Sequence, residues 1–187
     1  MRTLVSGLCL ALIASTSAAA QAAVQSRSTP TMPAAGEMAP DFSAPVAGRN
    51  GVETAPVTLS KLRGRVVVLA FYPGDRTPGC TAELTKFTQE YATMFGDGVV
   101  VLPISKDGLA SHASWAKDMG MPFNLISDTA GAVARLYASQ SRPGAGFTRN
   151  VFVIGKDGKI ALAISRLNAL SEEAYAPIKD AVAAAKK

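Results

Sequence analysis

The sequence contains little cysteine and histidine: two cysteines and one histidine among 187 residues. Cys9 lies in an N-terminal segment with the features of a secretory leader, so a processed chain would keep Cys80 alone. A single cysteine excludes an internal disulfide, and one cysteine with one histidine does not make a metal site. The sequence therefore predicts no disulfide scaffold and no bound metal, and no motif indicates another cofactor.

Long hydrophobic runs and clusters of one charge are also absent. A membrane-spanning helix needs about 18 or more apolar residues, and the longest run, from Leu4 to Ala14, is too short. The net charge is +5, but lysine and arginine are scattered along the chain. This pattern indicates a solvated basic surface rather than binding to nucleic acid or stable association with a membrane.

The chain divides into three predicted parts. Residues 1–23 combine Arg2, the apolar run and small residues around Ala20 and Ala22, so we expect a signal peptide and a periplasmic or secreted protein. Residues 24–36 are rich in Ser, Thr, Pro and Ala, which predicts a flexible linker. Residues 37–187 form one predicted domain, long enough to bury a core without disulfides.

Strands and helices are expected to alternate in that domain. A continuous β-branched run at 65–72 predicts a strand buried on both faces, typical of a parallel sheet. The other expected elements, in order, are a helix after the turn that ends near Gly96, a strand at 99–104, a helix at 109–119, a short strand at 123–126 and a helix at 129–138. This alternation favours right-handed βαβ units.

The C-terminal part has a different pattern. The stretch "NVFVIGKDGKIALAIS" predicts a hairpin whose turn contains Asp157-Gly158, a pair that supplies positive backbone angles. A closing helix is expected over 171–186, kinked or delayed by Pro177. The fold class predicted is α/β, with a central mixed sheet flanked by helices, close to the thioredoxin plan.

The stretch 71–87, "FYPGDRTPGCTAELTKF", leads from the first long strand into a helix. Thr77 followed by Pro78 is typical of a helix start, where the threonine hydroxyl caps and proline occupies the first position. Cys80 then falls at the third helical position. There, unpaired N–H groups and the helix dipole favour an anion such as a thiolate.

The helix terminus alone is too weak to ionise a thiol at neutral pH. A free cysteine is only about 3% thiolate at pH 7, and a helix terminus stabilises an anion by about 0.3 to 1 kcal/mol. A second positive partner is required. Arg76 is close in sequence, but Arg149 opens the hairpin strand expected beside the first strand, and we favour Arg149.

A thiolate, a hydroxyl and a guanidinium suit a small oxygen-rich electrophile such as a peroxide. Thr77 is expected to orient one peroxide oxygen, and Arg149 to stabilise charge on the leaving oxygen. Pro73, at the end of the strand, is expected to shield the sulfur from water.

At these residues the chain resembles a peroxiredoxin. "YPGDRTPGCT" contains the Pro-x-x-x-Thr-x-x-Cys pattern of that family as Pro73, Thr77 and Cys80, and "TRNVFVIGKDGKI" is similar to the strand with the family's arginine, here Arg149. "TPGCT" resembles the bacterioferritin comigratory protein, or peroxiredoxin Q, group. The resemblance extends over nearly the whole predicted domain, and it implies a thioredoxin-like fold and peroxidase activity on hydrogen peroxide and organic hydroperoxides.

One departure from that group changes the expected cycle. Many members have a resolving cysteine five residues after the first, and here that position is Thr85. The resemblance then implies a one-cysteine cycle, in which Cys80 becomes a sulfenic acid and an external thiol reduces it. Thioredoxin-like proteins, glutaredoxin-like proteins and small thiols all remain possible donors.

Several residues have simpler interpretations. Cys80 as an inert buried thiol, Thr77 as a plain cap and Pro73 as a strand end are structural alternatives. Glu83 matches a family position whose carboxylate orients the arginine, but a solvated glutamate explains it equally well. We expect His112 to be structural and away from the Cys80 loop. The alternative function is a thioredoxin-like binding or redox-sensing module that forms mixed disulfides with partner proteins.

Overall fold

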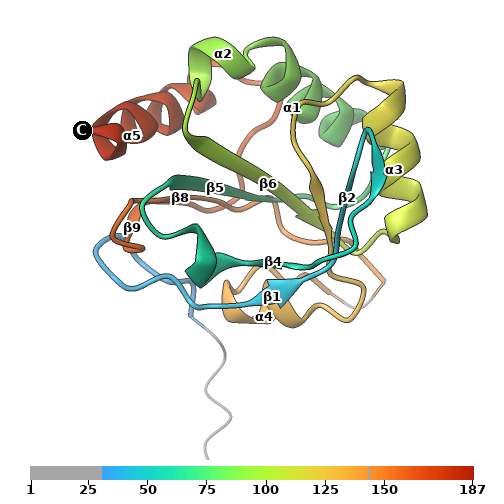
Figure 1. The fold of residues 1–187 in the computed structure, drawn as a ribbon, viewed down its shortest axis with the longest axis horizontal. Helices are drawn as coiled ribbons and strands as arrows, with labels where there is room; N and C mark the ends of the chain where they lie inside the picture. The colour runs from blue at the N-terminus through green and yellow to red at the C-terminus, as the bar shows by residue number, and fades with distance from the viewer. Residues whose placement is uncertain (1–30, 143) are drawn as a thin grey trace, which may run out of the picture.

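The computed structural model describes residues 31–142 and 144–187. Its centre is a seven-stranded sheet in the order β3-β2-β7-β6-β5-β8-β9 (Figure 1). The strands of this sheet are β2 (Val46–Gly48), β3 (Gly51–Val52), β5 (Val66–Phe71), β6 (Val99–Ser105), β7 (Leu125–Ser127), β8 (Val151–Ile154) and β9 (Ile160–Ile164). The pairs β5–β6 and β6–β7 are parallel and the other neighbours are antiparallel, so the predicted mixed sheet is confirmed.

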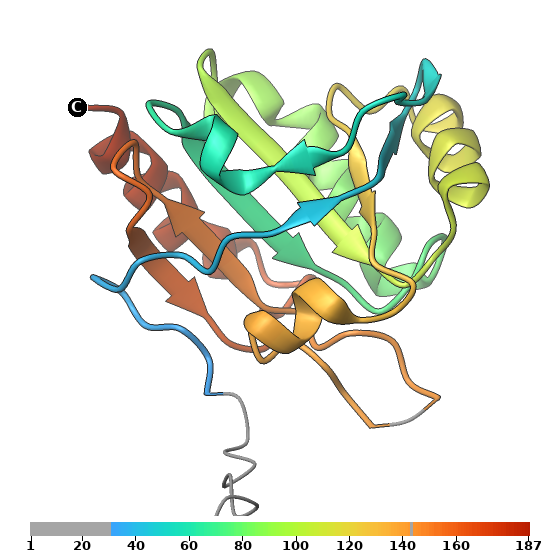
Figure 2. The same ribbon diagram turned by 60° about the horizontal axis from the view of Figure 1, so that its bottom comes forward.

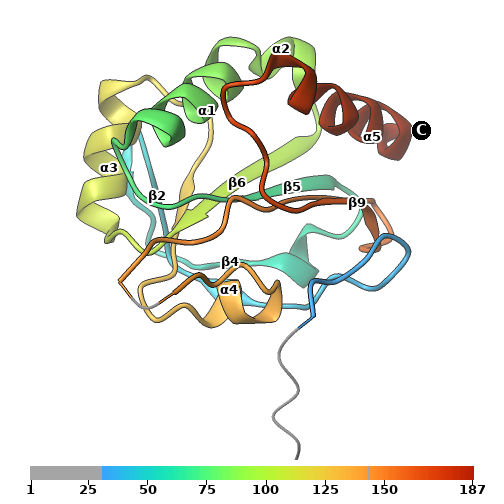
Figure 3. The same ribbon diagram turned by 180° about the vertical axis from the view of Figure 1, so that it is seen from behind.

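Helices cover both faces of the sheet. The helices are α1 (Pro78–Gln89), α2 (Tyr91–Met94), α3 (Leu109–Asp118), α4 (Ala132–Leu136) and α5 (Ala176–Lys186). Figure 3 shows α1, α2, α3 and α5 on one side, and α4 with the two-stranded ribbon of β1 (Ser43–Ala44) and β4 (Val57–Thr58) on the other. In the described part of the chain, no helix is long and apolar enough to span a membrane.

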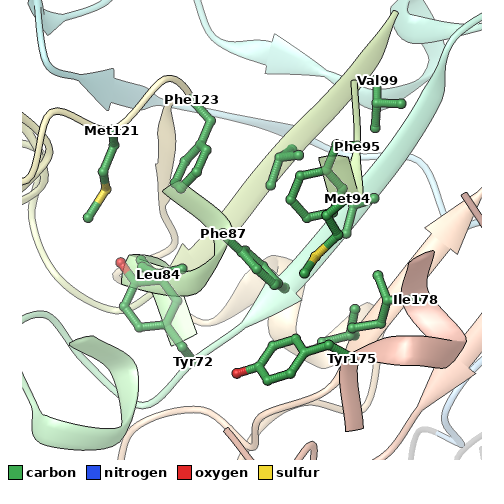
Figure 4. Packing of buried hydrophobic residues seen from close by; sticks show 14 of the residues in the cluster. Tyr72, Leu84, Phe87, Met94, Phe95, Val99, Met121, Phe123, Tyr175 and Ile178 are labelled. Atoms are coloured by element: carbon green, nitrogen blue, oxygen red, sulfur yellow. The ribbon is translucent and has the colours of Figure 1, made fainter. Parts of the chain in front are cut away.

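Alternate residues of β5 face two separate cores. Val66, Val68 and Ala70 join the core beneath α1, α2, α3 and α5, while Val67 and Leu69 join the core beneath α4. All six residues of β5 are buried, as the continuous apolar run predicts. Figure 4 shows the first core, where the Phe87 ring lies 5.2 Å from that of Phe95 and 6.0 Å from that of Tyr175.

Several predicted boundaries were wrong. The helix expected to run on to Gly96 is broken at Glu90, whose backbone angles (φ −100°, ψ 16°) leave the helical range. The apolar spacing continues across this break because α2 still packs its buried side chains on the same core. The helix expected at 129–138 is shorter, Ala132–Leu136, and the strand expected at 123–126 begins at Leu125 and ends at Ser127.

The C-terminal elements follow the prediction more closely. The hairpin is present as β8 and β9, although only Gly158 of the Asp157-Gly158 pair has a positive φ (77°). A 3₁₀ turn occupies Glu172–Tyr175, and α5 begins at Ala176 with Pro177 in its first turn. Proline therefore delays the α-helix without kinking it, because a backbone N–H in the first turn has no acceptor within the helix and its absence in proline breaks no hydrogen bond.

Two features of the N-terminal half differ from the prediction. The short strands β1 to β4 and a 3₁₀ turn at Leu59–Leu62 were not expected. The predicted linker also ends too late, because Pro33 is buried, Met32 packs on the core and the Gly36 N–H donates to the Ile160 carbonyl (2.8 Å). The predicted signal peptide and the first part of the linker lie outside the described residues.

Candidate active site

The predicted reactive cysteine lies where the sequence places it. β5 ends at Phe71, a short loop follows, and α1 begins at Pro78, so Cys80 is the third helical residue. Its side chain is fully buried, and it is the free cysteine of the described chain. The sulfur therefore sits at the N-terminal end of a twelve-residue helix, where the dipole favours negative charge.

Thr77 occupies the N-cap position but does not cap with its side chain. The first helical hydrogen bond runs from the Thr81 N–H to the Thr77 carbonyl (2.8 Å). The Thr77 hydroxyl instead donates to the Gly74 carbonyl (3.2 Å). The expected capping bond was wrong, and this exposed hydroxyl is tied to the turn that precedes the helix.

Arg149 reaches the sulfur from a distant part of the chain. β8 pairs with β5, with Val151 opposite Ala70, and this register brings Arg149, two residues before β8, beside the start of α1. The Arg149 Nη2 donates to the Cys80 Sγ at 3.4 Å. A Cβ added at Gly79 would lie 3.2 Å from the same nitrogen, so the glycine of "TPGC" leaves room for the guanidinium.

Glu83 completes this group from one turn further along α1. The Arg149 Nη1 donates to the Glu83 Oε2, and the glutamate is fully buried, so the solvated interpretation of Glu83 is wrong. Burial raises the pKa of the Glu83 carboxyl to about 7, and the charge and hydrogen bond of Arg149 oppose that rise only in part. Its Oε1 has no hydrogen-bond partner among the described residues.

The second candidate cation, Arg76, turns away from the sulfur. Its Nη2 contacts the Ser114 Oγ (3.1 Å) and the Asp118 Oδ2 (2.5 Å) on α3. The choice of Arg149 over Arg76 as the neighbour of Cys80 is therefore confirmed by the contacts.

Pro73 lies half-buried between two loops. A Cβ added at Gly146 would lie 1.8 Å from the Pro73 carbonyl oxygen, so the segment before β8 runs directly against the Cys80 loop. Pro73 belongs to the Cys80 loop, residues 72–77, and this contact packs it against the segment before β8. Its expected role as a shield for the sulfur stays a prediction.

His112 is close to the Cys80 loop, so its expected position was wrong. The imidazole is fully buried, and its Nδ1 lies 3.0 Å from the Asp75 Oδ2, while its Nε2 lies 3.2 Å from the Ile126 carbonyl. Both neighbours are acceptors, and only the doubly protonated imidazole donates to both. The structural role is consistent with these contacts, but the histidine holds the loop rather than a remote part of α3.

Asp75 is the residue that the sequence analysis missed. It also accepts hydrogen bonds from the Tyr72 hydroxyl (2.7 Å) and the Ser111 hydroxyl (2.6 Å). Burial opposes ionisation, but these bonds and the histidine lower the pKa of the Asp75 carboxyl below its usual value. The available signal was a charged residue between an apolar strand and a helix, together with a histidine on the apolar face of α3.

The chemistry that this arrangement supports is thiolate chemistry. A buried sulfur lies at a helix N-terminus, an arginine contacts it, and a buried glutamate orients that arginine. Within residues 31–142 and 144–187, no three His, Cys, Asp or Glu side chains gather as a metal site. Fixed donors beside one sulfur are suited to stabilising charge in an attack on a small electrophile.

Comparisons with known proteins agree with this chemistry. The model of the AhpC/TSA family matches residues 35–163. The putative peroxiredoxin bcp of Coxiella burnetii is 36% identical over 132 residues, which cover 67% of this chain and 84% of that protein. The chain spans a smaller share, 60%, of the chloroplastic peroxiredoxin Q of Sedum lineare.

Solved structures give the same result. The peroxidoxin BcpB of Mycobacterium tuberculosis is 29% identical with a TM-score of 0.70, covering 84% of this chain and all of that one. The bacterioferritin comigratory protein of Xanthomonas campestris, described for its alkyl peroxide reduction activity, is 26% identical with a TM-score of 0.66, covering 76% of this chain and 92% of that one. The thioredoxin-like fold prediction is confirmed by these neighbours. The chain therefore belongs to the AhpC/TSA family and, within it, to the bacterioferritin comigratory protein and peroxiredoxin Q group of thiol-dependent peroxidases.

Proposed function

We propose that this peroxidase works by a one-cysteine cycle at Cys80, with hydrogen peroxide and organic hydroperoxides as oxidants. The observation that carries this proposal is the 3.4 Å contact between the Arg149 Nη2 and the Cys80 Sγ. It supplies the second cation that a helix terminus alone lacks. The alkyl peroxide reduction activity of the Xanthomonas campestris relative supports the organic substrates.

The oxidative step transfers one oxygen atom. The Cys80 thiolate attacks the nearer peroxide oxygen, the O–O bond breaks, and a sulfenic acid forms. The other oxygen leaves as water or an alcohol after it takes up the proton lost by the thiol. Arg149 stabilises the developing charge on this leaving oxygen, Thr77 orients the peroxide, Pro73 shields the sulfur, and Glu83 fixes the guanidinium.

The reductive step needs a thiol from outside the chain, because Thr85 stands where many relatives have a resolving cysteine. One external thiol displaces water from the sulfenic acid and forms a mixed disulfide with Cys80. A second thiol then releases Cys80 and leaves as the oxidised disulfide. A thioredoxin-like protein, a glutaredoxin-like protein or a small thiol would each complete this cycle.

Stopped-flow mixing with hydrogen peroxide tests the proposal. Reduced protein should form sulfenic acid, trapped with a dimedone-type probe, much faster than a free thiol does. The Cys80→Ser variant should form none and should lose all peroxidase activity. A native rate no faster than that of a free thiol would favour the binding or redox-sensing module instead.

We also propose that the protein acts outside the cytoplasm. This rests on the leader-like features of residues 1–23, the basic start, apolar run and small-residue stretch. Expression of the full chain, followed by cell fractionation and N-terminal sequencing, tests it. Intact Met1 on the cytoplasmic protein would exclude export, whereas a new N-terminus near residue 23 in the periplasm would support it.

A further inference from the structure

A groove of about 690 Å³ adjoins the Cys80 loop. It is lined by Pro73 and Arg149 of the active site, by Arg142 and Phe147 of the segment between α4 and β8, and by Arg166 after β9. Figure 2 shows that the described residues on both sides of position 143, between α4 and β8, project from the molecule. The Arg149 guanidinium thus faces both the sulfur and this groove, which makes the groove an extension of the active site.

The charge of the groove is entirely positive. Three of its lining residues are arginines and none is acidic. Arg149 is paired with the buried Glu83, but Arg142 and Arg166 form no ion pair with any described residue. Two arginines without acidic partners beside an active-site cation favour a ligand with negative charge, and guanidinium matches carboxylate in a bidentate geometry.

A buried side chain connects the two walls of the groove. The Arg166 N–H donates to the Asn150 Oδ1 (3.1 Å), while the Asn150 Nδ2 donates to the Ser139 Oγ (3.0 Å). Asn150 is only 2% exposed. Arg166 itself has a positive φ of 55°, a conformation that a non-glycine residue keeps only where the surrounding structure imposes it.

The groove also has an apolar part. Phe147 is buried and its ring lies 6.3 Å from that of Phe71, so it is fixed in the core beneath the groove. The adjacent Gly146 runs against the Pro73 carbonyl, which brings this apolar part up to the Cys80 loop. A cationic rim over an apolar base, ending at Arg149, suits an organic molecule with an acidic end and a reactive end.

We propose that this groove binds the carboxylate of a small organic co-substrate whose reactive group is delivered to Cys80. The inference rests on the proposed one-cysteine function, which requires an external thiol. Two molecules share the required chemistry: an acidic thiol that reduces the sulfenic acid with loss of water, and an acidic hydroperoxide that oxidises the thiolate and leaves as the alcohol. Hydrogen peroxide itself needs no such groove.

Matched pairs of reactants that differ only in the carboxylate test the proposal. For the reductive step, sulfenic acid is prepared with hydrogen peroxide and mixed with 3-mercaptopropionate or its methyl ester. For the oxidative step, reduced protein is mixed with linoleic acid hydroperoxide or its methyl ester. The quantity compared is the ratio of the rate constant for the acid to that for the ester. Because both constants are measured on the same preparation, a smaller fraction of correctly folded protein lowers them equally and leaves the ratio unchanged.

The groove variant is Arg142→Gln/Arg166→Gln, and the control is Arg49→Gln/Lys61→Gln. Both remove two positive charges, and the control residues are exposed and lie outside the groove. The acid-to-ester ratio should fall at least about tenfold in the groove variant, since each charged hydrogen bond lost is worth at least that factor. The control should change it by less than about twofold at physiological salt, where distant surface charges are screened.

The outcomes separate the two sources and the two proposals. A fall in the reductive ratio alone assigns the groove to the reductant, a fall in the oxidative ratio alone assigns it to the hydroperoxide, and a fall in both assigns it to both. An unchanged ratio in both steps, or an equal fall in the control, overturns the inference. Slow sulfenic acid formation by the native protein would instead overturn the proposed function, whatever the ratios are.

Discussion

Two buried carboxylates lie near Cys80, Glu83 on α1 and Asp75 in the loop before it, and their surroundings shift their pKa values in opposite directions. Asp75 accepts bonds from the Tyr72 and Ser111 hydroxyls and from His112, so its pKa is lowered. Glu83 has Arg149 alone, with one oxygen unpartnered among the described residues, so burial dominates and its pKa rises.

This difference in hydrogen bonding indicates that Asp75 belongs to a rigid support, whereas Glu83 belongs to the reactive group around Cys80. A fully hydrogen-bonded buried network fixes one arrangement of its members. The Asp75 network also holds the loop backbone, because the Asp75 N–H donates to the Asp107 Oδ2 (2.9 Å) and that oxygen accepts from the Ser105 hydroxyl (2.7 Å). On the other side of Cys80, Arg149 contacts both the Glu83 carboxyl and the Cys80 sulfur, so Glu83 does not neutralise the whole charge of the guanidinium. Such an arrangement is expected where charge develops during a reaction.

The largest effect is expected for the His112→Ala variant. It removes the imidazole whose Nδ1 lies 3.0 Å from the buried Asp75 carboxylate, and loss of one partner of a buried salt bridge destabilises a protein by about 3 to 5 kcal/mol. Urea unfolding at pH 7 measures the loss. Because the pKa of Asp75 is lowered in the folded protein, its stabilising contribution is present above its ordinary pKa of 3.8 and is lost as the pH falls. The acid-side loss of stability should therefore be smaller in His112→Ala.

Ser111→Ala is the matched control for that variant. It removes one neutral donor to the same carboxylate and should cost about 1.5 kcal/mol, the low end of the range for a hydrogen bond to a charged group. Equal losses in the two variants would show that the histidine contributes no charge to this network.

The next effect concerns the reactive side, in the Arg149→Ala variant. Sulfenic acid formation should slow by about 100 to 1,000-fold, the usual result of removing one donor aimed at transition-state charge. Stopped-flow oxidation by hydrogen peroxide measures it. Arg76→Ala is the control, because Arg76 is four residues from Cys80 but contacts α3 instead. A near-native rate in Arg149→Ala would remove Arg149 from the proposed mechanism.

The residues around the Cys80 sulfur could be predicted from the sequence more completely than the network that supports the loop before α1. Cys80 was identified from the helix-start motif and Arg149 from the expected order of the strands, whereas Glu83 was named only because it matches a position of the family that the chain resembles. His112 was expected away from the loop because its contact with Asp75 joins residues 37 positions apart through the packing of α3. Its spacing to Trp115 and Ala116, which are also buried, indicated an inward-facing histidine but not what it would meet.

The long strands could also be predicted from the sequence, whereas the short strands could not. The runs that became β5, β6 and the β8–β9 hairpin have enough apolar residues to define a strand alone. Strands β1 to β4 have two or three residues each, too few to establish an alternating pattern, and pairing with β7 and with one another defines them. The break at Glu90 was missed because apolar spacing reports which face is buried and not whether the helical hydrogen bonds continue.

A third prediction concerns the pH dependence of stability in the Glu83→Gln variant. The folded protein holds the Glu83 proton up to a pKa of about 7, against 4.5 as the ordinary value. This contribution to stability is complete below pH 4.5 and is lost as the pH rises to about 7, a change of about 3 kcal/mol at about 1.4 kcal/mol per pKa unit. Glu83→Gln should lack this decline.

Urea unfolding of both proteins between pH 4.5 and 8 measures that decline. Glu90→Gln, at the exposed end of α1, should keep the native pH dependence. A decline of equal size in native protein and Glu83→Gln would mean that Glu83 is ionised throughout this range, with Arg149 neutralising it fully.

The smallest effect is expected for Tyr72→Phe. The hydroxyl donates to the Asp75 Oδ1 (2.7 Å), and both burial and the Asp75 charge raise the pKa of Tyr72, so it stays a donor. Asp75 keeps His112 and Ser111 after the change, and the cost should be about 1.5 kcal/mol in urea unfolding, the low end for a hydrogen bond to a charged group. A cost as large as that of His112→Ala would mean that the support depends on a chain of coupled bonds rather than on one ion pair, because removal of any member would then release the whole loop.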